Sequence, residues 1–149
     1  MICIDWPVAA VLTTAYTFGR FIACRPPMRE SIMSRDLARV FAEIDVFDPD
    51  KFVAHLTPDV RFRFANADPV TGRPAVKEAV AGFFSAIDGL THHIRNVWEF
   101  GDTVVVQIDV EYLRKDGKTV TVPNADILIY DGDLVRDWQI YIDVAPVFA

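Results

Sequence analysis

The sequence has only two cysteines, Cys3 and Cys24, and both lie in the N-terminal stretch, outside the part that has the pattern of a folded domain. They have no partners at zinc-ligand spacing and form no disulfide framework, so a reducing cytoplasm is the expected compartment. Clusters of lysine and arginine are also missing, and the formal net charge is −6. Nucleic acids and anionic membranes attract basic surfaces, so neither is expected as a partner.

Two kinds of binding motif are missing as well. The chain has no glycine-rich phosphate loop, and its three histidines, His55, His92 and His93, lack the spaced carboxylates of a metal site. The sequence therefore implies no cofactor and no metal. Hydrophobic residues make up 52% and charged residues 24% of the 149 positions. This composition excludes a disordered chain and favours one domain with a substantial core.

Residues 1–32 differ from the rest of the chain, and three interpretations of them stay open. The apolar run over residues 8–24 is interrupted by a glycine and an arginine, is short for a membrane span, and is not preceded by the positive charge of a signal peptide. The segment is an arm that packs on the domain, an extension upstream of a working start at Met28 or Met33, or a targeting segment. The domain itself is expected over residues 33–149.

Apolar residues recur at helical spacing in the first part of this domain. Ser34 is a good N-cap for a first helix, and Asp48 with Pro49 predicts the start of a second. A third helix is expected from about Pro74 to Ile87. Between the second and third helices, Val60 to Phe64 alternates apolar and basic residues, which predicts a strand with two different faces.

The rest of the domain has the pattern of strands joined by tight turns. Asp-Gly pairs at two of the turns are strong hairpin signals. The four expected strands are Thr91–Phe100, Thr103–Arg114, Lys118–Tyr130 and Leu134–Asp143. Helices first and an antiparallel meander after them predict the α+β class.

This order of elements, together with four short stretches, resembles the SnoaL-like branch of the nuclear transport factor 2-like superfamily. The stretches are Thr57-Pro58-Asp59-Val60, Gly72-Arg73-Pro74-Ala75-Val76, Gly101-Asp102-Thr103-Val104, and Asp131-Gly132-Asp133-Leu134 followed by Tyr141-Ile142-Asp143. The resemblance covers Met33 to Phe148. It implies a cone-shaped fold, with N-terminal helices packed on a curved, mainly antiparallel sheet around an apolar pocket, and homodimers through the outer sheet face. The superfamily hosts isomerases, hydrolases, dehydratases, cyclases and non-enzymatic binders, so it names no single reaction.

The resemblance also implies which residues stand at known site positions. The limonene-epoxide-hydrolase-like members hold a water with five polar residues, of which only one aspartate is matched here, by Asp109. Gln107, Phe62, Phe64 and Ile140 stand at the other four positions. A lone carboxylate cannot support that mechanism, so this activity is rejected. The aspartate base of the steroid-isomerase-like members is missing too, whereas an aspartate–histidine pair, as in the polyketide-cyclase-like members, stays open.

The strand that carries Asp109 has two different faces. Val105, Gln107, Asp109 and Glu111 alternate with Val104, Val106, Ile108, Val110 and Tyr112. The resemblance places Gln107 and Asp109 inward, and the even-numbered residues then form an apolar outer face for a homodimer to cover. In the reverse arrangement the even-numbered residues are core and Asp109 is solvated.

The catalytic candidates are Asp109 as a base, with His92 or Asp126 as its partner. His92 and His93 are neighbours in a strand, so only one of them points inward. His92 is the choice, because an inward imidazole can act as a base near neutral pH, and a surface pair is the alternative. Asp126 is a polar residue in an apolar strand, where it lines the pocket or forms a salt bridge with an arginine.

The remaining pocket lining is expected from three strands. It consists of Phe62, Phe64, Val105, Gln107, Trp138 and Ile140. The leading interpretation is a small-molecule pocket that performs cofactor-free acid/base chemistry (isomerisation, hydration or dehydration, or cyclisation) on an apolar substrate. The alternative is a non-catalytic ligand-binding or dimerisation module.

Overall fold

The computed structural model describes residues 35–149, so the expectations for residues 1–32 lie outside the described residues. Helix α1 spans Leu37–Ile44 and α2 spans Pro49–Ala54. The Asp48 side chain caps α2 as expected, with its carboxylate accepting from the backbone N–H of Asp50. The cap of α1 is Asp36 rather than Ser34, because its carboxylate accepts from the N–H of Arg39 at 3.0 Å.

Six strands form one sheet in the order β2-β1-β6-β5-β4-β3. Their bounds are β1 Leu56–Phe64, β2 Val70–Thr71, β3 Gly89–Phe100, β4 Thr103–Leu113, β5 Thr119–Asp131 and β6 Leu134–Ile142. Strands β3 to β6 form the expected antiparallel meander, and β1 joins it in parallel beside β6. The α+β fold with helices on a curved, mainly antiparallel sheet is confirmed.

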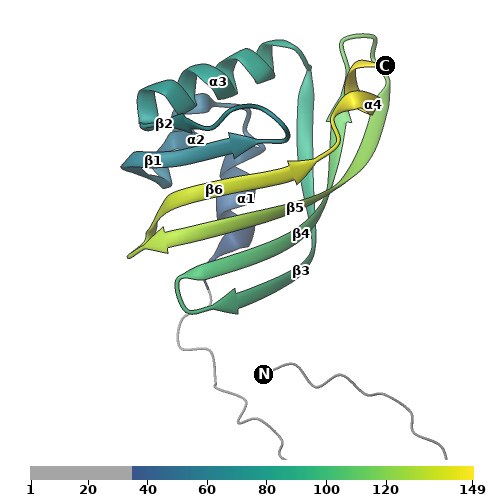
Figure 1. The fold of residues 1–149 in the computed structure, drawn as a ribbon. Helices are drawn as coiled ribbons and strands as arrows, with labels where there is room; N and C mark the ends of the chain where they lie inside the picture. Colours follow the sequence, from purple (N-terminus) through teal and green to yellow (C-terminus); the bar gives the residue numbers. More distant parts are fainter. Residues whose placement is uncertain (1–34) are drawn as a thin grey trace, which may run out of the picture. The chain divides into compact units, whose positions relative to one another are not determined.

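The helices cover one side of this sheet. Helix α3, Arg73–Ser85, lies along the end that β1 forms, and α1 and α2 lie behind the strands on the same side (Figure 1). A short α4, Ala145–Phe148, follows β6 and was not expected. Strand β1 starts at Leu56 rather than at the predicted Val60, and its pairing with β6 is irregular between Leu56 and Arg61. None of the helices in residues 35–149 is long and apolar enough to cross a membrane.

The face of β4 that packs under the helices is the even-numbered one. Its buried residues are Val104, Val106, Ile108, Val110 and Tyr112, none more than 3% exposed. The expectation that Gln107 and Asp109 point inward, with the even-numbered face outside, is therefore wrong. Burial of these five apolar side chains stabilises the folded protein more than burial of the polar, odd-numbered face would, so the even-numbered face forms the core.

The outer face of the sheet is mixed rather than polar throughout. Trp98, Val105 and Ile127 are neighbours across β3, β4 and β5 on this face. Trp98 is 45% exposed, while Val105 and Ile127 are half-buried. We call these three residues the outer apolar row.

Candidate functional site

A cavity of about 210 Å³ lies between the helices and the inner face of the sheet. Most of its wall is apolar, and half of its lining residues are aromatic. The aromatic lining residues are Phe41, Phe52, Phe62, Phe64, Phe83, Phe84, Tyr112 and Trp138. At its base the rings of Phe52 and Trp138 are stacked with centroids 5.1 Å apart, and Phe41 meets the edge of Trp138. These large ring contacts fix the shape of the cavity floor.

Asp126 is a carboxyl group in this apolar wall. It lies on β5, is 1% exposed, and accepts a hydrogen bond on Oδ2 from the Trp138 indole N–H at 3.0 Å. Its other oxygen, Oδ1, has no partner among the described residues. Burial raises the pKa of Asp126 to about 6, although the charge of His92, the Trp138 hydrogen bond and the nearby side chain of Asn124 all lower it. A carboxyl with such a pKa exchanges protons near neutral pH.

His92 reaches the cavity from β3 and is held by a residue of α1. The imidazole Nδ1 lies 2.6 Å from Oδ1 of Asp45, and the backbone N–H of His92 donates to Oδ2 of the same carboxylate at 3.1 Å. Asp45 is the C-cap of α1 and carries no proton to donate when ionised, so Nδ1 is the protonated ring nitrogen. Nε2 is then the nitrogen that can accept a proton, and it has no hydrogen-bond partner within residues 35–149.

Tyr112 adds a third polar group, on β4. Its ring is 3% exposed and lines the cavity. Burial, and then the nearby charge of Asp126, raise the pKa of the Tyr112 hydroxyl well above its usual range. The phenol therefore stays protonated at any physiological pH and can donate a hydrogen bond to a bound oxygen.

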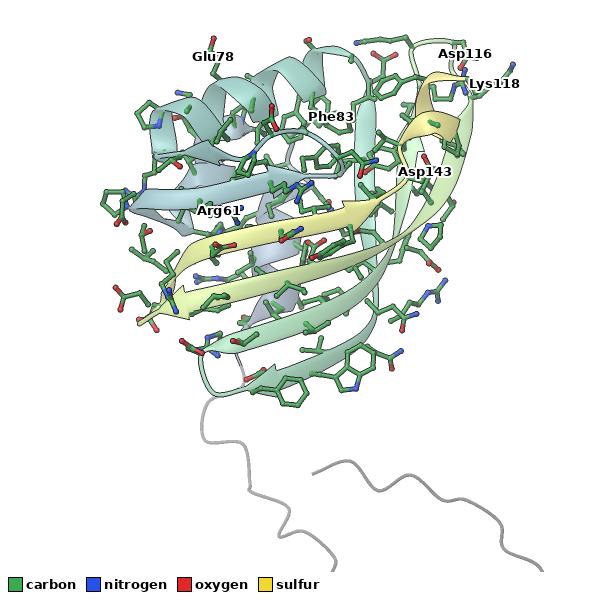
Figure 2. The ribbon with its side chains drawn as sticks, viewed as in Figure 1. Arg61, Glu78, Phe83, Asp116, Lys118 and Asp143 are labelled. Carbon is green, nitrogen blue, oxygen red and sulfur yellow. The ribbon has the colours of Figure 1, made fainter. Side chains whose placement is uncertain are left out.

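The cavity opens between α3 and the segment that follows β1. Ala67 and Ala79 are exposed there, and Phe64 and Phe83 are half-buried with ring centroids 4.8 Å apart. Figure 2 shows Phe83 on the side of α3 that faces the sheet, while Glu78 of the same helix points away from it. We call Phe64 and Phe83 the mouth pair.

The structure separates the three catalytic candidates. His92 and Asp126 line the same cavity, and His93 is exposed. Asp109 lies on the outer face, where Arg95 donates to its Oδ2 from Nε at 2.7 Å and from Nη2 at 2.6 Å. The expected role of Asp109 as a pocket base does not fit this position, because the β4 backbone turns it away from the cavity.

The expected lining divides in the same way. Phe62, Phe64, Trp138 and Ile140 line the cavity. Val105 and Gln107 do not, since they share the outer face of β4 with Asp109, and Gln107 accepts a hydrogen bond there from Asn96 at 2.7 Å.

Sequence reasoning missed two polar residues of the site, Asp45, which holds His92, and Tyr112, which lines the cavity. Asp45 carries no motif and lies 47 residues from its partner His92. The sequence analysis placed Tyr112 only on the apolar, even-numbered face of its strand. Tyr112 is the last residue of the even-numbered face of β4. Once that face is known to be the inner one, the position of Tyr112 identifies it as a residue that faces the helices.

The sequence over residues 37–138 matches the family of the SnoaL-like domain, and the chain belongs to that family. Among curated proteins, none matches the sequence.

Several solved structures share the fold at low sequence identity. A protein of Catenulispora acidiphila with a ketosteroid isomerase-like fold, solved with trimethylamine, has a TM-score of 0.70 at 19% identity, with 77% of this chain and 91% of that chain covered. TerC, co-crystallised with polyporic acid, has a TM-score of 0.65 at 19% identity, with coverage of 74% and 90%. SalBIII, an epoxide hydrolase/cyclase-like enzyme in pyran ring formation of salinomycin, has a TM-score of 0.63 at 18% identity, with coverage of 72% and 87%. These similarities establish the fold.

Proposed function

We propose that this protein is a cofactor-free acid/base enzyme that transfers protons on a small apolar substrate, with His92 and Asp126 as the catalytic pair. The observation that carries the proposal is a buried carboxyl with one unpartnered oxygen in the same cavity as an imidazole held by a second carboxylate. A cavity that only bound an apolar ligand would gain nothing from a buried carboxyl, because burying such a group costs free energy.

His92 is suited to the role of general base. The hydrogen bond to Asp45 keeps the proton on Nδ1 and stabilises the imidazolium that forms when Nε2 accepts a second proton. Asp45 itself is a positioning residue, since it acts through His92. Asp126, with its pKa of about 6, can return a proton to the substrate from another strand.

The reactions that need only these groups begin with removal of a proton next to a carbonyl or from a hydroxyl, and end with protonation of carbon or oxygen. Isomerisation, dehydration and ring closure through an enol all follow this scheme. Tyr112 would donate a hydrogen bond to the oxygen on which negative charge develops. The similarity to SalBIII, an epoxide hydrolase/cyclase-like enzyme, supports this class of reaction.

Proton transfer can be tested before the natural substrate is known. We would incubate the protein with 1-indanone in D₂O and follow deuterium incorporation next to the carbonyl by mass spectrometry. The variants His92→Gln and Asp126→Asn are expected to lower the catalysed rate by about 10²- to 10⁴-fold, the usual contribution of a general acid or base. Asp109→Asn makes the same chemical change on the outer face and should leave the rate unchanged.

A wild-type rate no faster than buffer, across a set of small neutral ketones, would favour the ligand-binding alternative. Equal loss of rate in Asp109→Asn and Asp126→Asn would contradict the assignment of the pair to the cavity.

We also propose that the protein forms a homodimer through the outer face of the sheet. The outer apolar row of Trp98, Val105 and Ile127 crosses three strands of that face and supports the proposal. Tyr141, on β6, adds a side chain that is 51% exposed. Apolar side chains that are adjacent on a surface gain free energy when a second copy covers them.

A further inference from the structure

The volume of the cavity limits the substrate. A closed apolar cavity of about 150 Å³ holds one benzene molecule. The cavity here, of about 210 Å³, is about 1.4 times as large and so encloses roughly eight or nine non-hydrogen atoms at the same packing. Its open mouth lets part of a second ring extend beyond the enclosed volume. Three fused rings exceed the enclosed volume, so a third ring would press against the mouth pair of Phe64 and Phe83.

The mouth pair of Phe64 and Phe83 also limits the size of the ligand, because it lies at the entrance of the cavity. Phe83 touches Phe64 at 4.8 Å between centroids, and its ring also meets the edges of Tyr112 at 6.0 Å and Phe148 at 6.2 Å. A ring held by three aromatic neighbours does not swing aside freely, because each contact contributes free energy that the movement would lose.

The charges around the cavity limit the substrate in a second way. No lysine or arginine is among the lining residues, whereas Asp126 carries a carboxyl into the wall. His92 is the one basic group there, and the carboxylate of Asp45 already accepts its hydrogen bond at 2.6 Å. A ligand carboxylate would therefore enter an apolar cavity with no free cation to pair with, next to a group of the same charge.

We infer that the substrate is an uncharged compound of one or two rings that carries an oxygen function. The inference rests on the proposed function for the chemistry but not for binding. The wall of aromatic side chains supplies the contacts for a ring, and the unpartnered Oδ1 of Asp126 and the Tyr112 hydroxyl can hydrogen-bond to one oxygen.

The charge arm of the test compares 2-naphthol with 2-naphthoate by calorimetry at pH 7.5. Naphthoate should bind at least about 30-fold more weakly. At this pH Asp126 must either stay charged beside the ligand or take up a proton about 1.5 pH units above its pKa. Asp126→Asn should reduce the ratio of the two dissociation constants by about tenfold, and Asp109→Asn should leave that ratio unchanged. Affinities of the two compounds within threefold of each other in the wild-type protein would overturn the inference.

The size arm compares phenol, 2-naphthol and 9-phenanthrol, which have one, two and three rings. Phenol and 2-naphthol should bind, and 9-phenanthrol should bind about tenfold more weakly than 2-naphthol because it does not pass the mouth pair. Phe83→Ala should remove that difference, while Phe100→Ala, which removes an exposed phenyl ring outside the cavity lining, should keep it. Binding of the three-ring compound as tight as that of 2-naphthol in the wild-type protein would overturn the size limit.

The two proposals fail in different ways. Selective binding of neutral one- and two-ring compounds without deuterium exchange would uphold the ligand class and refute the catalytic role. Deuterium exchange together with equal binding of naphthol and naphthoate would uphold catalysis and refute the ligand class.

Discussion

Asp126→Asn is expected to make the protein more stable at neutral pH. The buried carboxyl has a pKa of about 6 in the folded protein against 3.8 for the free side chain. The folded state therefore binds the proton more tightly than the unfolded state between these two values. It follows that the stability contributed by Asp126 is fully present below about pH 3.8 and is lost as the pH rises through about 6.

The size of this effect follows from the shift. A difference of about 2.2 pKa units corresponds to roughly 3 kcal/mol at pH values above both. Asparagine cannot ionise, and its side-chain oxygen can still accept the hydrogen bond from the Trp138 indole. The free energy of unfolding of the variant minus that of the wild type should therefore grow by roughly 2–3 kcal/mol between pH 4 and pH 7, since the unfolded carboxyl is already partly ionised at pH 4. This is roughly 5–10 °C in melting temperature for a chain of this length.

Urea unfolding of both proteins at half-unit steps from pH 4 to pH 8 measures this difference. The amide of asparagine adds an offset that does not depend on pH, so the slope of the difference is the decisive quantity. Asp109→Asn is the matched control, because its carboxylate is on the outer face with Arg95. Parallel curves for wild type and Asp126→Asn would refute the reasoning, since they would mean that the carboxyl keeps an ordinary pKa.

Three further outcomes are expected. Asp45→Asn should lower deuterium exchange by about tenfold or more and change the ¹⁵N shifts of His92, because the imidazole loses the carboxylate that fixes its tautomer; unchanged shifts would exclude a positioning role. Trp138→Phe should raise the pKa of Asp126 further by removing the indole N–H, so the alkaline limb of the pH–rate profile, where the general acid loses its proton, should move to higher pH; a limb that stays in place would count against Asp126 as the titrating group. Ile127→Lys should give a monomer by light scattering where the wild type gives a dimer, since a lysine inside the interface would lack a partner; a wild-type monomer at micromolar concentration would contradict the dimer.

Local sequence signals predicted most of the elements. The cap and proline at Asp48 and Pro49 start α2 where expected. The two Asp-Gly turns place glycine at a positive φ, with 78° at Gly117 and 58° at Gly132, and join β4 to β5 and β5 to β6. Such signals act over a few residues, so they are visible without knowledge of the fold.

These local signals could not predict which distant strands lie side by side. Strand β1 lies parallel to β6, more than seventy residues further along the chain, through pairs such as Phe62 with Trp138. Nothing in either segment specifies this neighbour, because parallel pairing depends on the whole arrangement of helices and strands between them.

The candidate site shows the same division. Alternation along β4 predicted two distinct faces, and the placement of Asp109 inward relied on the resemblance; the structure has the more apolar face inside. The sequence by itself determined the fold class, the meander and the alternation of side chains, because these depend on neighbours in the chain. Tertiary structure alone decided which face is the core, and it brought the Asp45 carboxylate to within 2.6 Å of His92, since only the packing of α1 against β3 joins positions 47 residues apart.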